Sequence, residues 1–570
     1  MRYRSIFFSV VMLFYAVKGH AETSLEIKGL DGEPQKNVEQ YLSSIPSSDY
    51  STSLRFKARI ESKIESALNA LGYYNPEIEF ISSENALTVN IQLGPPTVVK
   101  TVDFQLTGDA ENDQDFLDLL QKSSIKEGEK LSHSAYDSLK SNIQNLALEK
   151  GYFNGKFVAN RIEVSPKTNQ ANIILHYESG KRYLFGKTIL QGSQIDNDRV
   201  LSLKGFEEGE PYRMKQISEF SQNLSSTDWF SSVLVEPDFS NLENKTELPV
   251  KVTLDPAAKN QLETGIGYST DVGVKGTLTW NKPWLNSAGH SFTSSFSLSS
   301  PEQTITASYK IPLEDVLHEY YQIQYGLKKV DNLDTQSLES NLSLERHWLE
   351  DNGWNKTLFV RYLVENYEQG VLDDIGQFVL PGVTFSRTRT RTRNSQLITW
   401  GDKQTVTLEY GNENMLSETD ILRLQASTSW IRSYGDNQRG LIRLSGGANL
   451  VDDFDKVSPS LRFFAGGDNS IRGYTYESIS PKDSTDSLTG AKYLATSSIE
   501  YQYRLFGKWW GAVFYDYGDA FNTEPDFKRG TGFGIRWISP LGPLRLDFAW
   551  GLDSDPGDQF KIHFTLGPEL

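Results

Sequence analysis

The sequence F-A-G-G-D-N-S-I-R-G-Y, from Phe464 to Tyr474, is the stretch around which the rest of the chain can be interpreted. It lies in the segment 451–491, which is rich in Ser, Asp, Gly and Pro, and loops of this length are usually functional or disordered. Its paired glycines permit backbone conformations that a Cβ would forbid. The candidate motif residues are Gly466, Gly467, Arg472, Gly473 and Tyr474. This stretch alone leaves open the alternative of a hairpin loop with an incidental arginine.

The two runs that follow this loop alternate apolar and polar residues, as strands with one apolar face do. Glu500 falls on the polar face of the run 498–504, and Asp516 falls on the polar face of the run 512–518. A loop folded against these faces would place Arg472 between the two carboxylates, with charge-assisted hydrogen bonds away from bulk water. We therefore predict a structural clamp and not an acid–base pair in an open cleft.

Alternation without helical patterns extends over the whole region 261–570. Segments of about ten residues, separated by turn residues, are the signature of a transmembrane β-barrel, and about sixteen can be counted. This number is even, as bacterial barrels require. If the first strand leaves the periplasm, the loop after the eleventh strand, 451–491, is extracellular. A soluble β-sandwich is the alternative, which the long meander without Pro/Gly-rich breaks disfavours.

The region before the barrel repeats itself at intervals of about 80 residues, a period outside the range of stacked solenoids. The tripeptide E-G-E at 127–129 returns at 208–210, and G-Y-Y-N at 72–75 matches G-Y-F-N at 151–154. The predicted modules, each β-α-α-β-β, cover residues 22–97, 98–180 and 181–260. A mixed sheet leaves an edge strand to which a partner can add a strand, so we expect recruitment of a partner. Inert spacers are the alternative.

The composition excludes several classes of function. The chain has 570 residues, too many for one ordinary domain. Hydrophobic residues make up 38% and mean hydropathy is −0.46, yet 12% of residues are aromatic, which suits a protein that displays aromatics at an interface. The net charge of −17 makes nucleic acid an unsuitable partner. The absence of cysteine excludes disulfides, thiolate nucleophiles and zinc–thiolate sites.

Residues 1–21 have the pattern of a signal peptide. Arg2 and Arg4 precede the apolar run 6–17, and G-H-A at 19–21 forms a small-x-small cleavage site. An uncleaved membrane anchor is the alternative, but the apolar run is shorter than the ~20 residues that span a bilayer. We expect cleavage after Ala21 and secretion.

Enzymatic motifs are weak in this sequence. Neither H-E-x-x-H nor G-x-S-x-G occurs, and G-K-R-Y-L-F-G-K-T at 180–188 misses the spacing of a phosphate-binding loop by one residue. The seven histidines are scattered without metal-ligand spacing. We predict no catalytic site, no cofactor and no metal site.

The motif residues of the loop 464–474 resemble the lid-loop signature of the outer-membrane protein assembly superfamily, and F-Y-D-Y-G at 514–518 resembles its companion strand motif. Members of this superfamily join periplasmic POTRA modules to a sixteen-stranded barrel. The resemblance covers the whole mature chain. By this resemblance Arg472 is the lid-loop arginine, Asp516 its main lumenal partner and Glu500 a second one. Three modules, instead of the five of BamA or the two of two-partner secretion transporters, point to the TamA subgroup. So do R-T-R-T at 387–390, T-W-G-D at 399–402 and the ending L-G-P-E-L at 566–570.

The resemblance implies a function in the outer membrane of a Gram-negative bacterium, with the modules in the periplasm. It implies an insertase and translocation factor for autotransporters and other β-barrel clients. An inner-membrane-anchored TamB-like protein would dock on the first module. The sequence departs from the pattern of many outer-membrane barrels in ending with Leu570 and not with an aromatic residue.

The predicted site of client entry is the seam between the first strand, 262–269, and the last strand, 560–567. Glycine weakens strand pairing, so this seam should be the weakest in the wall. The candidate seam residues are Gly265, Gly267, Phe564 and Gly567. Residue register cannot be derived from the sequence, and Gly265 with Thr565 or Gly267 with His563 are registers to test. The rival hypothesis is a passive channel, porin or two-partner-secretion transporter, but a pore does not need three amino-terminal modules.

Overall fold

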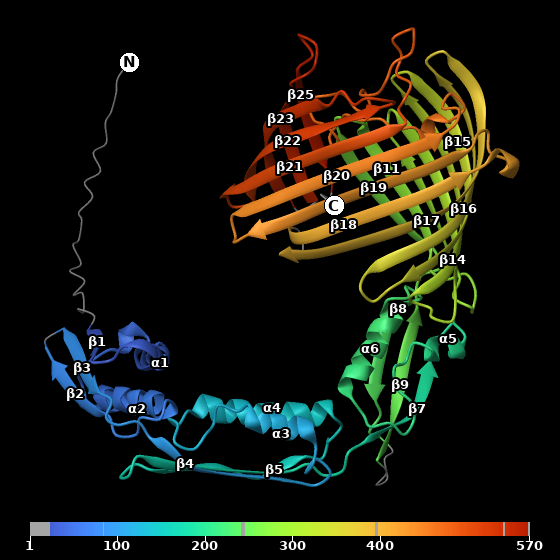
Figure 1. Cartoon of the computed structure of the whole chain (residues 1–570). Coiled ribbons are helices and arrows are strands. Elements are labelled where there is room, and N and C mark those ends of the chain that lie inside the picture. The colour runs from blue at the N-terminus through green and yellow to red at the C-terminus, as the bar shows by residue number, and fades with distance from the viewer. Residues whose placement is uncertain (1–22, 84, 241–245, 394–396, 540–541, 568–570) are drawn as a thin grey trace, which may run out of the picture. The chain divides into compact units, whose positions relative to one another are not determined.

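The computed structural model describes residues 23–83, 85–240, 246–393, 397–539 and 542–567 (Figure 1). The predicted signal peptide, 1–21, lies outside the described residues. Among the helices of these ranges, none combines the length and the hydropathy of a membrane span. The residue limits that we assign to the domains stay a prediction, and the elements below are given with their own bounds.

Three small α+β modules share one order of elements. The first contains β1 Ser24–Lys28, α1 Gly32–Leu42, α2 Leu54–Ala70, β2 Glu77–Ser82 and β3 Ala86–Gln92. The second contains β4 Val98–Thr107, α3 Gln114–Gln121, α4 His133–Glu149, β5 Lys156–Ser165 and β6 Gln170–Glu178. The third contains β7 Leu184–Gln191, α5 Asn197–Leu201, α6 Met214–Ser225, β8 Phe230–Pro237 and β9 Glu247–Pro256.

Each module places its last strand in the middle of a three-stranded sheet, in the orders β1-β3-β2, β4-β6-β5 and β7-β9-β8. In the first module β3 is parallel to β1 and antiparallel to β2. The alternate residues Leu87, Val89 and Ile91 of β3 are buried against α2, whose apolar residues recur at helical spacing. Burial of each such side chain contributes about 1.5–3 kcal/mol. The first module therefore has a core of its own.

Sixteen antiparallel strands of the described ranges form a closed barrel, in sequence order from β10 to β25 (Figure 1). The first eight are β10 Gln261–Ser269, β11 Gly273–Lys282, β12 Ser291–Leu298, β13 Glu302–Pro312, β14 Glu319–Asn332, β15 Thr335–Leu349, β16 Trp354–Gln369 and β17 Leu372–Arg393. The others are β18 Leu397–Gly411, β19 Ile421–Tyr434, β20 Gln438–Val451, β21 Tyr493–Phe506, β22 Trp509–Phe521, β23 Lys528–Ser539, β24 Gly542–Gly551 and β25 Phe560–Leu566. Three modules followed by a sixteen-stranded barrel confirm the predicted fold class.

The barrel wall follows the alternation of the sequence. On β22, Val513, Tyr515 and Tyr517 are 55%, 45% and 38% exposed on the outside, whereas Phe514 and Asp516 are buried inside. Neighbouring strands satisfy the backbone groups along most of the wall. We call the end of the barrel at which β10 begins the proximal rim and the opposite end the distal rim.

The two strands that close the barrel are joined far less than other neighbours. All nine residues of β10 are in register with β11, from Gln261 opposite Asn281 to Ser269 opposite Gly273. In the described part of the chain, the ladder between β10 and β25 consists of the single pair Ser269 and Thr565. The closing seam is therefore held by little backbone pairing, at the distal end of β10.

The segment between β20 and β21, residues 452–492, is packed and is called the lid loop below. It contains a short 3-10 helix, Pro459–Leu461, and the bridges Phe463 to Ala491 and Ala465 to Ile479. Its apolar residues form a buried cluster that includes Ala520 of β22: Phe463, Ala465, Ile471, Tyr474, Ile479, Ala491 and Ala520. The lid loop is thereby packed against the barrel wall.

Candidate functional site

The lid loop presents Arg472 from a turn that only glycine tolerates. Gly473 has φ +95°, and a Cβ at this position would lie 2.4 Å from the backbone nitrogen of Gly551 in β24. Gly467 has φ +101°, and a Cβ there would lie 2.6 Å from a carboxylate oxygen of Asp271. The positive φ and the close approach both require the absence of a side chain. The glycines of the motif thus bring the loop backbone against the wall.

Arg472 makes a two-pronged ion pair with the barrel. Its Nε donates to Oδ2 of Asp516 at 2.8 Å and its Nη2 donates to Oδ1 at 2.9 Å. The backbone N–H of Arg472 also donates to Oδ2 of Asp516, at 3.0 Å. Its Nη1 donates to Oε2 of Glu500 at 2.6 Å. The structure thus brings Arg472, Asp516 and Glu500 together, with side chains that are 1%, 0% and 4% exposed.

Two further charged residues, which the sequence reasoning missed, complete this network. Arg536 of β23 donates to Glu500 at 2.8 Å and to Asp547 of β24 at 2.6 Å. Asp547 in turn lies 3.4 Å from Nη1 of Arg472. Both residues stand at polar positions of alternating strands, so the sequence signal for a lumenal face was present. Their level along the barrel, which determines whether they meet Arg472, depends on strand register.

The network is suited to holding the lid and not to chemistry. It contains the carboxylates of Glu500, Asp516 and Asp547, and the guanidinium groups of Arg472 and Arg536. Removing one member of a buried ion pair strands the other charge, which is strongly destabilising. The guanidinium carbon of Arg472 also lies 3.5 Å from the ring centre of Phe514, a cation–π contact. The lid arginine is therefore enclosed by partners on three strands, β21, β22 and β24.

A second set of lid contacts bridges both strands of the closing seam. Oδ1 of Asp468 accepts a hydrogen bond from Thr270, just after β10, at 3.0 Å. The same carboxylate accepts from Nδ1 of His563 at 2.5 Å and from Thr565 at 3.1 Å, both on β25. We call Thr270, Asp468, His563 and Thr565 the seam clasp. Through this clasp the lid loop touches the first hairpin and the last strand together.

The hydrogen bonds of the seam clasp indicate which ring nitrogen of His563 carries the hydrogen. The backbone N–H of Gly473 donates to Nε2 of His563 at 3.0 Å, so Nε2 is an acceptor and Nδ1 carries the proton given to Asp468. Asp271, Asp468 and His563 each offer one ligand atom within 4.8 Å of the others, the distance at which a cation can be shared. Because both ring nitrogens of His563 already have partners, we interpret the cluster as a hydrogen-bonded contact. In the turn outside the strands, burial and the neighbouring Asp468 carboxylate raise the pKa of Asp271 to about 7.

Of the residues predicted at the seam, Gly267 and Phe564 lie near the opposite strand of the seam, whereas Gly265 and Gly567 contact the neighbouring strands β11 and β24. A Cβ on Gly265 would meet Thr277 of β11, and a Cβ on Gly267 would lie 3.9 Å from the carbonyl of Leu566. The carbonyl of Phe564 accepts from the N–H of Thr270 at 3.0 Å. Gly567 follows β25, and its N–H donates to Pro543 at 3.3 Å.

The registers suggested for testing, Gly265 with Thr565 and Gly267 with His563, are wrong. Ser269 stands opposite Thr565, because only the distal end of β10 reaches β25.

Comparison with protein families identifies both parts of the chain. Residues 259–569 match the family described as the Omp85 superfamily domain. Residues 24–94 match the family described as POTRA domain TamA domain 1, and residues 99–180 match the POTRA family described as surface antigen variable number repeat. The Omp85 match alone covers more than half of the chain.

Curated relatives and a solved structure agree with these families. The chain is 24% identical over 445 residues to the outer membrane protein assembly factor BamA of Nitratidesulfovibrio vulgaris, covering 72% of this chain and 54% of that protein. It is 22% identical over 479 residues to BamA of Neorickettsia risticii, covering 78% and 62%. The chain thus spans less than two thirds of the length of these relatives. The crystal structure of BamA from Haemophilus ducreyi lacking POTRA domains 1–3 has a similar fold, with TM-score 0.68, 15% identity and coverage of 81% and 98%.

Proposed function

The chain belongs to the Omp85 superfamily, and from this premise we propose that it inserts β-barrel clients, autotransporters among them, through the seam between β10 and β25. Its barrel lies in the outer membrane and its POTRA modules lie in the periplasm, so the proximal rim is periplasmic. Entry at the seam is our inference from the geometry, and the clients are our inference from the family and from the TamA-type POTRA match. The observation that carries it is the contrast between nine register pairs on one side of β10 and a single pair on the other.

This contrast has a direct physical consequence in a membrane. A backbone N–H or C=O group without a hydrogen-bond partner in lipid costs several kcal/mol. A barrel wall therefore opens only between strands that share few hydrogen bonds, or where a new strand replaces the bonds that are lost. At the seam, only one register pair in the described residues joins β10 to β25, so little pairing is lost when the two strands part. A client strand can then supply the missing backbone partners by strand addition. The seam is therefore where a client enters at the lowest cost.

The lid loop is proposed to hold this seam closed between clients. Arg472 fixes the loop to β21 and β22, and Asp468 of the same loop fixes Thr270 and His563 on the two sides of the seam. Only three residues separate Asp468 from Arg472 in the chain, so movement of one contact changes the other. Release of the lid is then coupled to release of the seam.

The proposed activity can be tested with purified protein. Full-length protein is reconstituted into phospholipid vesicles, an unfolded autotransporter barrel is added, and its folding is followed by the shift in gel mobility of unheated samples. We expect folding at least severalfold faster than in empty vesicles or in vesicles that contain an unrelated porin. Ion conductance without faster client folding would instead support the passive channel. Equal folding in all three vesicles would reject the insertase.

A TamB-like periplasmic partner is proposed to dock on the first module. The support is the match of residues 24–94 to a TamA-type first POTRA domain and a sheet whose outer strands are β1 and β2. Deleting residues 23–94 removes this module with its own core and ends at the linker Gly94-Pro95-Pro96. We expect a membrane-inserted barrel that no longer captures the partner in a pull-down. Undiminished capture would move docking to another module.

A further inference from the structure

A cluster of arginines surrounds one tryptophan on the barrel at β17, β18 and β19. It contains the R-T-R-T and T-W-G-D sequences, to which neither the lid network nor the seam assigns a role. We call it the arginine patch, and its members are Arg387, Arg389, Arg391, Trp400, Asp402 and Arg432. The lid, the seam and the modules contribute none of these residues.

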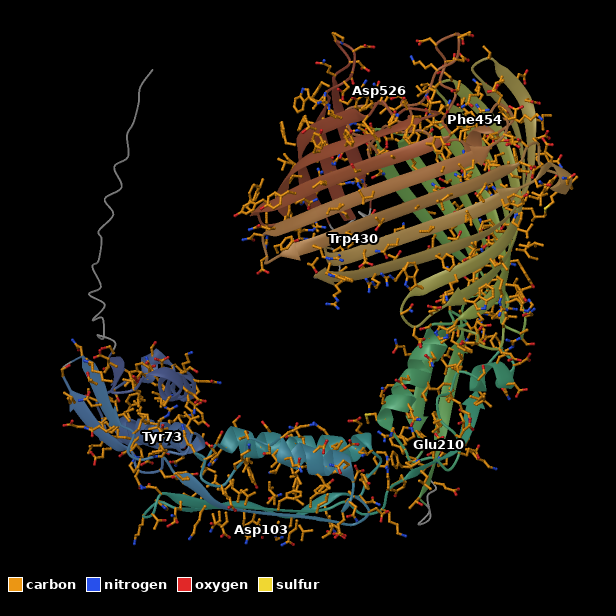
Figure 2. The ribbon with its side chains drawn as sticks, in the orientation of Figure 1. Tyr73, Asp103, Glu210, Trp430, Phe454 and Asp526 are labelled. Carbon is orange, nitrogen blue, oxygen red and sulfur yellow. The ribbon has the colours of Figure 1, made fainter. Side chains whose placement is uncertain are left out.

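The arginine patch faces outward, where lipid surrounds the barrel. Along β18, Trp400 and Asp402 have the same parity as Val406 and Leu408, which are exposed on the outer wall. Register places Arg389 opposite Asp402 and Arg391 opposite Trp400, so these arginines share that face. On β19, Arg432 is two residues after the exposed Trp430 and therefore lies on the same face. Trp430 is labelled on the barrel in Figure 2.

The patch lies near the periplasmic end of the wall. The chain enters the barrel at Gln261 from the periplasm. Counting β10 as the first barrel strand, the second, fourth and every later even strand therefore run back toward the periplasm. β17 is the eighth strand and β19 the tenth, and their arginines lie near the carboxyl ends of these strands, while Trp400 lies near the start of β18. Arginine and tryptophan at this level are placed where the periplasmic leaflet has its headgroups.

The arginine patch contains more positive charges than negative charges. Asp402 is 1% exposed and pairs with Arg389 at 2.9 and 3.1 Å, with Arg432 at 3.5 Å and with Arg387 at 3.9 Å. Four arginines, Arg387, Arg389, Arg391 and Arg432, against this one carboxylate leave an excess of three positive charges. Unbalanced cations next to hydrocarbon are costly unless an anion or the headgroup region compensates them.

The tryptophan arranges these guanidinium groups around a common surface. The guanidinium carbons of Arg389, Arg391 and Arg432 lie 5.2, 5.2 and 4.5 Å from the ring centre of Trp400. Arg389 is 42% exposed and Arg432 33% exposed, so both can take a further ligand beyond Asp402. Planar guanidinium donors held in this way match the oxygens of a phosphate group.

We propose that the arginine patch binds the phosphate headgroup of an anionic phospholipid in the periplasmic leaflet of the outer membrane. The outward face, the level of the headgroups and the excess of three positive charges all favour a lipid over a soluble anion. β17 and β18 are the eighth and ninth of sixteen strands, so the site lies on the wall across the barrel from the seam. A lipid bound there would anchor the wall that does not open.

The same wall contains a natural control for this proposal. Arg346 of β15 lies 4.9 Å from the ring centre of Tyr321 and 5.0 Å from that of Trp348. It has the aromatic setting of the patch, but it forms an ion pair with Glu319. Arg346 therefore carries no excess charge, and Arg346→Gln should leave lipid binding unchanged.

The test measures lipid retention by full-length protein in neutral detergent. Native mass spectrometry follows binding of phosphatidylglycerol and of phosphatidylcholine to the parent, to Arg391→Gln and to Arg346→Gln. An arginine near an anionic headgroup is worth about fivefold in affinity. We expect the parent to prefer phosphatidylglycerol, Arg391→Gln to bind it about fivefold more weakly, and Arg346→Gln to match the parent. Inorganic phosphate at millimolar concentration should not displace the lipid.

A second variant of the arginine patch, whose folding is checked separately, tests the same proposal. Arg389→Gln/Asp402→Asn/Arg432→Gln removes two cations without leaving a buried carboxylate unpaired, and gel mobility of unheated samples verifies that the barrel is folded. The excess of positive charge falls from three to two, as in Arg391→Gln, so we expect the preference for phosphatidylglycerol to fall about fivefold in this folded variant as well. Equal retention of the two lipids by the parent would overturn the proposal. So would undiminished phosphatidylglycerol binding by both patch variants, or full displacement of the lipid by inorganic phosphate.

Discussion

Replacing Arg472 with alanine is expected to release the lid loop while the barrel stays folded. The substitution removes both guanidinium hydrogen bonds to Asp516, which is 0% exposed, and the contact with Glu500. Stranding one partner of a buried ion pair costs about 3–5 kcal/mol, so the docked lid should lose on the order of a hundredfold in population or more. The backbone ladders of the wall do not involve the Arg472 side chain, and the barrel should keep its gel mobility.

Protease access to the lid loop in whole cells measures this release. We expect rapid cleavage within the segment 452–492 in Arg472→Ala and protection in the parent. Arg472→Lys keeps the charge but not the two-pronged geometry and should be intermediate. Adding Asp516→Asn to Arg472→Ala removes the stranded carboxylate and should restore part of the protection.

A matched control comes from the surface of the same loop. Lys482 pairs with Asp486 where both side chains are exposed, and such pairs contribute little. Lys482→Ala should therefore be as protected as the parent. Protection of Arg472→Ala equal to that of the parent, with undiminished client assembly, would show that the buried network does not hold the lid.

Much of the architecture could be predicted because successive side chains of a strand point to opposite faces, so apolar and polar residues alternate with a period of two. That period assigned Glu500 and Asp516 to the lumenal face, and both lie within hydrogen-bond distance of Arg472. It does not determine the height of a residue along the barrel, which follows from strand tilt and stagger. For this reason Arg536 and Asp547, although at polar positions, could not be assigned to the same network.

The seam was harder to predict for a related reason. Glycines in β10 pointed to weak pairing, but the pairing that remains is at Ser269, beyond both Gly265 and Gly267. His563 was dismissed because the sequence shows no ligand spacing around it. The fold brings it to Asp468, 95 residues earlier in the chain, through a loop whose path the sequence does not specify. Long-range contacts made by irregular segments are the part that local patterns miss.

Joining the two seam strands covalently is expected to abolish client assembly. Because the parent has no cysteine, Ser269→Cys/Thr565→Cys introduces one possible disulfide across the observed register pair. Directly opposed residues in antiparallel strands have Cα atoms about 4.5–5.5 Å apart, within the range that a disulfide bridges. A closed bond prevents β10 and β25 from parting, so a client strand cannot enter. We expect assembly to fall to the level without the protein.

A control variant introduces a disulfide between β11 and β12, two neighbouring strands that do not have to part for a client to enter. Thr279 of β11 and Ser295 of β12 are a register pair whose hydroxyls lie 3.1 Å apart, and Thr279→Cys/Ser295→Cys resembles the seam pair in residue type. Oxidation of this control should leave client assembly unchanged. It therefore separates the effect of a blocked seam from the effects of oxidation and of substituted hydroxyls.

The most direct measurement is client assembly by Ser269→Cys/Thr565→Cys before oxidation, after oxidation and after reduction. Lateral entry predicts normal assembly, then loss together with formation of the crosslink, then recovery when the disulfide is reduced. Complete crosslinking with undiminished assembly would contradict it, because clients would then reach the membrane without parting β10 from β25.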